Sequence, residues 1–119
     1  DHAANIANHV VMLNGSKQKI PADLLDLMFT AGTEATDLYE KAVAAFFEKD
    51  VVSSNDIVEK LEDVEKVDRE IASRAFMSKQ KNPEMICSIC SLRDGILRIA
   101  EYAADIAEVA IDRAFRIPV

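Results

Sequence analysis

The sequence predicts an all-α fold, an antiparallel three-helix bundle with an extra helical segment at its N-terminus. Apolar residues recur at alternating spacings of three and four in three long stretches, which is the pattern of packed helices. Only three glycines and three prolines interrupt the 119 residues, and half of the residues are apolar. Short breaks near residues 50–54 and 79–83 separate the stretches, and short links make neighbouring helices antiparallel.

The first predicted helix begins at Pro21, because proline is favoured in the first turn of a helix. Its apolar stripe consists of Leu24, Met28, Ala31, Ala35, Leu38, Ala42 and Ala45. Gly32 lies within this helix, where glycine costs about 1 kcal/mol relative to alanine. We therefore expect a closely packed neighbouring helix beside Gly32.

The second predicted helix follows the first break and is capped by Ser53, Ser54 or Asn55. Its apolar stripe consists of Ile57, Leu61, Val64, Asp68, Ile71 and Ala75. The third helix runs from Pro83 to Phe115, a length of about 50 Å. Its stripe consists of Met85, Ile89, Leu92, Ile96, Ile99, Ala103, Ile106 and Ala110.

The first thirteen residues repeat part of the third helix. DHAANIANHVVML, residues 1–13, aligns with EYAADIAEVAIDR, residues 101–113, with four identities and a constant offset of 100 residues. A constant offset of this kind is typical of an internal repeat. We therefore expect a fragment, in which residues 1–14 end a preceding repeat and residues 15–119 form one complete three-helix repeat.

Charge and composition restrict the possible partners. The net charge of -7 argues against nucleic acid, whose phosphates need a basic face. No apolar run approaches the roughly 20 residues of a membrane helix, so membrane insertion is not expected. No secretory signal is recognisable, and two cysteines provide no disulfide framework. A reducing cytoplasm is therefore the expected compartment.

Acidic residues on two predicted helices are candidate metal ligands. Glu101 and Asp105 are one turn apart, so their carboxylates can converge on one hard cation. The simpler interpretation is a solvated acidic stripe opposite the core. Asp68 is either a ligand aimed at these acids or an acid at the edge of the core. At the edge it would reach water or pair with a cation such as Arg74, since an unpaired buried acid is costly.

The cysteines and histidines give little support for catalysis. Cys87 and Cys90 lack the second pair of a zinc ribbon and the strand-to-helix context of a redox motif, so we expect small buried residues. His2 and His9 share a helix face and are expected at a surface or interface, with metal ligation beside Asp1 as the alternative. No other histidine and no phosphate-binding glycine loop is present, so the sequence makes no positive case for an enzyme.

Three phrases of the sequence resemble PhoU-type phosphate-uptake regulators. The most specific is the DHAANIA block at residues 1–7, which recurs as EYAADIA at residues 101–107. EKLEDVEKVDREI, residues 59–71, is similar to the middle helix of the family's repeat. KAVAAFFEKD, residues 41–50, is similar to the end of its first helix.

The resemblance implies a cytoplasmic, all-helical regulator built from two similar three-helix repeats. Such proteins repress phosphate uptake and the phosphate-starvation response through contact with a phosphate ABC transporter and a sensor histidine kinase. A homodimer is also expected.

The resemblance also implies a metal site in some family members, which bind iron or zinc clusters through acid-xxx-Asp motifs. The matching positions here are Glu101, Asp105, Asp68, Asp1 and Asn5. The motif is incomplete, because Val64 replaces an acid, Asn5 replaces another acid, and Tyr102 replaces the usual histidine. The chain itself is therefore expected to hold iron or zinc weakly or not at all.

Two other classes of function stay open at this point. A metal-binding bundle of the di-iron type usually needs Glu-xx-His pairs on two helices, and this chain has none. A structural or dimerisation bundle would use its acids only for solubility. Elemental analysis of protein purified without chelator separates the di-iron class from the others.

Overall fold

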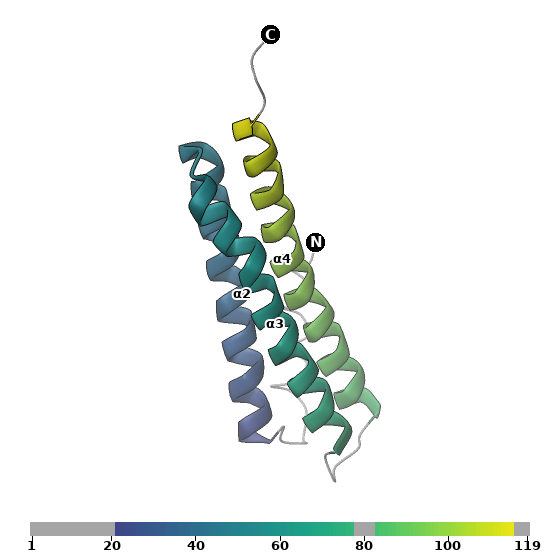
Figure 1. Ribbon diagram of the computed structural model, residues 1–119. Helices are drawn as coiled ribbons and strands as arrows, with labels where there is room; N and C mark the ends of the chain where they lie inside the picture. Colours follow the sequence, from purple (N-terminus) through teal and green to yellow (C-terminus); the bar gives the residue numbers. More distant parts are fainter. Residues whose placement is uncertain (1–20, 78–82, 116–119) are drawn as a thin grey trace.

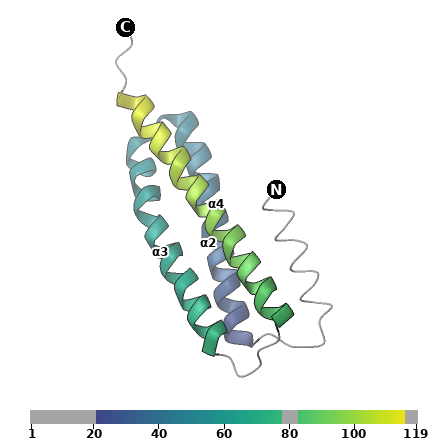
Figure 2. The same cartoon turned by 90° about the vertical axis from the view of Figure 1, so that its right-hand side faces the viewer.

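A computed structural model describes residues 21–77 and 83–115, and these form three helices. They are α2 (Ala22–Glu48), α3 (Val51–Met77) and α4 (Pro83–Phe115). The helices lie side by side, with α3 running antiparallel to α2 and α4 (Figures 1 and 2). No strand occurs among the described residues, and the predicted all-α three-helix bundle is confirmed. The predicted N-terminal helical piece, residues 1–14, lies outside the described residues.

The core lies along the shared axis of the three helices. All seven residues of the predicted α2 stripe are buried. On the other helices Leu61, Ile99 and Ile106 are only half-buried and pack at the margin of the core. Because α4 packs along both α2 and α3, residues outside its predicted stripe are buried as well, among them Ala100 and Ala107. These small side chains let helix axes approach closely.

The turn between α2 and α3 is shorter than predicted. Lys49 adopts the left-handed conformation, with φ 57° and ψ 39°, and its N–H donates to the Ala45 carbonyl. Asp50 then caps α3, because its carboxylate accepts hydrogen bonds from the Ser53 N–H at 3.0 Å and the Ser53 hydroxyl at 2.6 Å. The hydrogen bond from the Ser53 hydroxyl is the main cause that lowers the pKa of Asp50. The prediction of Ser53, Ser54 or Asn55 as the cap was therefore wrong, since α3 begins at Val51.

The neighbouring helix predicted beside Gly32 is α4, but it does not approach closely enough to require glycine there. A Cβ atom placed on Gly32 would lie 3.8 Å from Ile96 Cδ1, which is ordinary van der Waals contact. The Gly32 carbonyl accepts a hydrogen bond of 2.8 Å from the Thr36 hydroxyl. An alanine would therefore fit this position.

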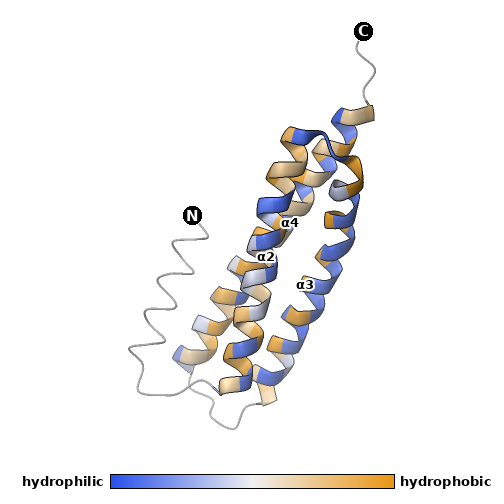
Figure 3. Cartoon of the chain, turned by 90° about the vertical axis from the view of Figure 1, so that its left-hand side faces the viewer, coloured by the Kyte–Doolittle hydropathy of each residue, from blue (hydrophilic) through white to orange (hydrophobic). Residues whose placement is uncertain are grey.

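Two side-chain interactions fix α2 against the other helices. The Arg74 guanidinium on α3 lies 3.0 Å from Asp23 at the start of α2 and 2.9 Å from Glu70. Near the other end of the bundle, the Arg113 guanidinium of α4 lies 5.2 Å from the centre of the Phe46 ring of α2. Hydrophilic segments recur along the outer surfaces of the helices, notably along α3 (Figure 3). Within the described residues, no helix is long and apolar enough to cross a membrane.

Candidate functional site

Asp68, the acid predicted on the apolar stripe of α3, forms an ion pair with Arg93 of α4. The Arg93 Nε and Nη2 atoms donate to the two carboxylate oxygens of Asp68 at 3.0 and 3.2 Å. The side chains are 15% and 26% exposed, so Asp68 lies at the edge of the core as one of the two interpretations expected. The hydrogen bonds with Asp68 are the main cause that raises the pKa of Arg93. The cation suggested from the sequence, Arg74, instead pairs with Asp23 and Glu70.

Glu101 and Asp105 lie on α4, away from Asp68. Glu101 is half-buried and Asp105 is exposed. Arg93, which holds Asp68, precedes Glu101 by eight residues, or about 12 Å along the helix. The structure therefore keeps Glu101 and Asp105 one turn apart on one helix but does not bring Asp68 to them. Asp1 and Asn5 lie outside the described residues.

The described residues do not fit an iron or zinc site. A bound transition metal needs at least three protein donors in most sites, whereas Glu101 and Asp105 supply two. Asp68 is already occupied by a guanidinium. No group of three or more His, Cys, Asp or Glu side chains suitable for a metal occurs within residues 21–77 and 83–115. Metal binding stays a prediction that depends on Asp1 and Asn5.

The acids of α4 instead form a continuous face, which is half-buried at Glu101 and exposed at its other three positions. Glu101, Asp105, Glu108 and Asp112 follow one another at spacings of four, three and four, which places them on one side of a helix. None of the four makes an ion pair with another residue that the structure describes. We call these four residues the acidic face. Their charges are neutralised by no neighbouring side chain of the described bundle.

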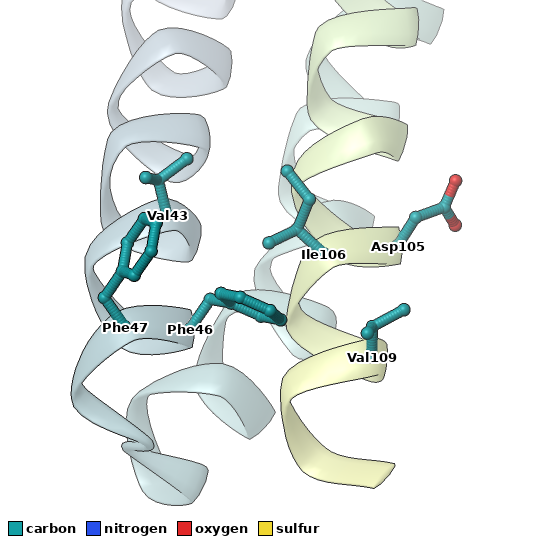
Figure 4. Close-up of a pocket in the computed structure, with 6 residues that line it drawn as sticks. All are labelled: Val43, Phe46, Phe47, Asp105, Ile106 and Val109. Carbon is teal, nitrogen blue, oxygen red and sulfur yellow. The ribbon is translucent and has the colours of Figure 1, made fainter. Parts of the chain in front are cut away.

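An apolar groove adjoins the acidic face between the C-terminal halves of α2 and α4. It has a volume of about 340 Å³ and is lined by Val43, Phe46, Phe47, Asp105, Ile106 and Val109. The Asp105 carboxylate points away from the apolar side chains (Figure 4). Phe47 is 78% exposed and Val109 is 55% exposed. The groove therefore presents apolar surface next to negative charge, an arrangement suited to contact with another protein surface.

The two cysteines contradict the sequence prediction. Cys87 and Cys90 were expected to be small buried residues, but both are exposed on α4. The core at this end of α4 is filled by Met85 and Ile89. Ser88 is buried here as well, whereas Cys87 and Cys90 lie at exposed positions of the helix.

Arg93 and the apolar groove are the features that the sequence prediction missed. Asp68 on an apolar stripe signals that a cation must come from a facing helix. Arg93 directly follows Leu92, a core residue of α4, and so was available at the margin of the core. The groove depends on the relative positions of α2 and α4, for which the sequence carries no comparable signal.

A family model for the PhoU domain matches residues 30–110. This match extends from the third turn of α2 to the last turns of α4 and so includes the Asp68–Arg93 pair and most of the acidic face. Neither the curated proteins nor the solved structures give a match. The family is a regulatory one that is concerned with phosphate. With about two-thirds of its length covered by the domain model and a three-helix bundle as its fold, the chain belongs to the PhoU family.

Proposed function

We propose that this chain is a regulator that represses phosphate uptake and the phosphate-starvation response by contact with other proteins. The proposed partners are a phosphate ABC transporter and a sensor histidine kinase, and the proposed setting is the cytoplasm, with the protein as a homodimer. The match to the PhoU domain supports the phosphate-related regulatory class. The partners come from the resemblance of the sequence to that family.

The observation that carries the proposal is the acidic face of α4 beside an apolar groove. Four carboxylates without a cationic partner in the described bundle form a negative surface. Such a surface attracts a basic patch on a partner and accelerates their association. Phe47 and Val109 supply adjacent apolar area, which a contact needs at its centre.

Binding measurements with charge-reversed variants test this proposal. The variant Asp105→Lys/Asp112→Lys reverses two charges on the acidic face. Its control is Glu59→Lys/Glu62→Lys, which changes the net charge equally at two exposed positions of α3. Each variant is titrated against the purified transporter ATPase subunit and the kinase cytoplasmic region at low and physiological salt.

We expect the α4 variant to bind at least about tenfold more weakly at low salt, and the α3 control to bind within about twofold of the parent chain. Parent binding should weaken as salt increases, because salt screens exposed charges. Equal weakening of both variants would mean that net charge alone matters. Unchanged binding by the α4 variant would remove the acidic face from the contact.

A further inference from the structure

Cys87 and Cys90 form an exposed pair of thiols near the start of α4. The helix begins at Pro83, so the pair lies in its second and third turns. Residues three apart on a helix lie on the same side, with Cβ atoms about 5–6 Å apart. Both thiols are exposed, at the opposite end of α4 from the acidic face and the groove.

The surroundings of the pair include one fixed cation. Arg93 follows Cys90 by three residues, and its interaction with the Cys90 thiol adds to the effects that raise the pKa of Arg93. Asp68 holds the guanidinium in place through two hydrogen bonds. The guanidinium is therefore a positive charge held beside Cys90, and the thiolate is the reactive form of cysteine. Asp94, one turn after Cys90, is a nearby negative charge and lies 3.9 Å from Arg98.

A metal site does not account for the two thiols. A structural zinc site uses four ligands, and the pair has no third His, Cys, Asp or Glu donor grouped with it among the described residues. The remaining chemistry of two adjacent accessible thiols is thiol–disulfide exchange.

We propose that Cys87 and Cys90 are a reversible redox pair that a low-molecular-weight disulfide, such as oxidised glutathione, converts to an intrahelical disulfide. In the first step the Cys90 thiolate attacks one sulfur of the oxidant, forming a mixed disulfide and releasing one thiolate. The Cys87 thiolate then attacks the Cys90 sulfur and releases the second thiolate. The two cysteines lose two electrons and two protons, and the oxidant becomes two thiols.

Helix geometry permits this disulfide but strains it. The Cα atoms of residues three apart on a helix are separated by about 5 Å, which lies within the range for a disulfide. Their Cβ atoms are about 1–2 Å farther apart than a disulfide allows, so α4 must tighten locally near its start. Strained and exposed disulfides are easily reduced. The pair is therefore expected to respond to the redox state of its surroundings and not to act as a permanent crosslink.

The test exposes the reduced full chain to buffers with different ratios of reduced to oxidised glutathione. Remaining thiols are then alkylated and the intact protein is weighed by mass spectrometry. The parent chain should lose two hydrogens and show protection of both cysteines, reversibly. Cys87→Ser should instead retain one glutathione on Cys90, because it lacks the resolving thiol.

A second measurement examines the role of Arg93. Alkylation of Cys90 in a Cys87→Ser background should slow by about threefold on adding Arg93→Gln, because the substitution removes a positive charge that attracts the thiolate. Circular dichroism confirms that the variant is folded. The proposal is overturned if the parent chain accumulates mixed disulfides or disulfide-linked dimers, or if it stays reduced in every buffer. It does not depend on the partners proposed above, whose binding is measured separately.

Discussion

The Asp68–Arg93 ion pair gives a quantitative test of the packing between α3 and α4. Removing one partner of a fully buried pair costs about 3–5 kcal/mol, whereas exposed pairs contribute less than about 1 kcal/mol. With side chains 15% and 26% exposed and two hydrogen bonds of 3.0 and 3.2 Å, this pair falls between these limits. We expect Asp68→Ala or Arg93→Met to lower the free energy of unfolding by about 2 kcal/mol each. At this chain length that is a decrease in Tm of about 8 °C.

A double-mutant cycle isolates the interaction itself. Urea unfolding followed by far-ultraviolet circular dichroism should give a coupling energy of about 1–1.5 kcal/mol between Asp68→Ala and Arg93→Met. The matched control is Arg98→Met, since Arg98 is half-exposed on the same helix and lies 3.9 Å from Asp94; its effect should stay below about 0.5 kcal/mol. A coupling energy under about 0.3 kcal/mol would mean that the ion pair between Asp68 and Arg93 does not stabilise the fold. If Asp68 were instead a metal ligand, iron or zinc would raise the Tm of the parent chain but not that of Asp68→Ala.

Three further predictions concern the α2–α3 turn and the core. Lys49→Gly should stabilise the fold by up to about 1 kcal/mol in urea unfolding, because glycine adopts the left-handed conformation without strain; a destabilisation would contradict that conformation. Asp50 has a lowered pKa, so its stabilising effect is present above its unfolded pKa and lost as pH falls through its folded pKa. Asp50→Asn should therefore keep the cap, since asparagine also caps helices. Its Tm should fall less than that of the parent chain between pH 6 and about pH 3. An identical pH profile of Tm for the two proteins would exclude a capping carboxylate. Ile89→Ala, at a position 1% exposed, should cost about 3 kcal/mol, whereas Val52→Ala, at a position 82% exposed, should cost under about 0.5 kcal/mol; equal effects would place Ile89 outside the core.

The helices and most of their buried sides could be predicted because helix periodicity is a local signal. The α2 stripe is buried as predicted from Leu24 to Ala45. The start of α4 at Pro83 is also as predicted. In such segments the spacing of apolar residues and the few proline and glycine positions agree with each other, and tertiary packing has no reason to override them.

The errors concern features that local spacing does not determine. Asp50, not a following serine or asparagine, caps α3, because α2 ends at Lys49 in the left-handed conformation and α3 already begins at Val51. Arg74 was a poor candidate for Asp68, since residues six apart on one helix do not face each other. The partner of Asp68 came from another helix, where the register between α3 and α4 decides which side chains meet.

The candidate site was predictable only as a set of acids on one helix. The spacing of Glu101 and Asp105 correctly placed them on one side of α4. The PhoU domain match supports the family that the sequence resembles. Whether such acids bind a cation or a protein depends on what faces them in space. In the described bundle, Asp68 faces Arg93 and the acidic face is open beside the groove.

Expression from a phosphate-starvation promoter in phosphate-replete cells tests the regulatory role most directly. The cells carry the full-length gene with Asp105→Lys/Asp112→Lys or with the α3 control Glu59→Lys/Glu62→Lys, and immunoblots verify equal protein levels. We expect the α4 variant to raise expression toward the level of a deletion strain, while the control stays repressed like the parent. Full repression by the α4 variant, or no change in expression on deletion, would contradict a phosphate regulator that acts through the acidic face.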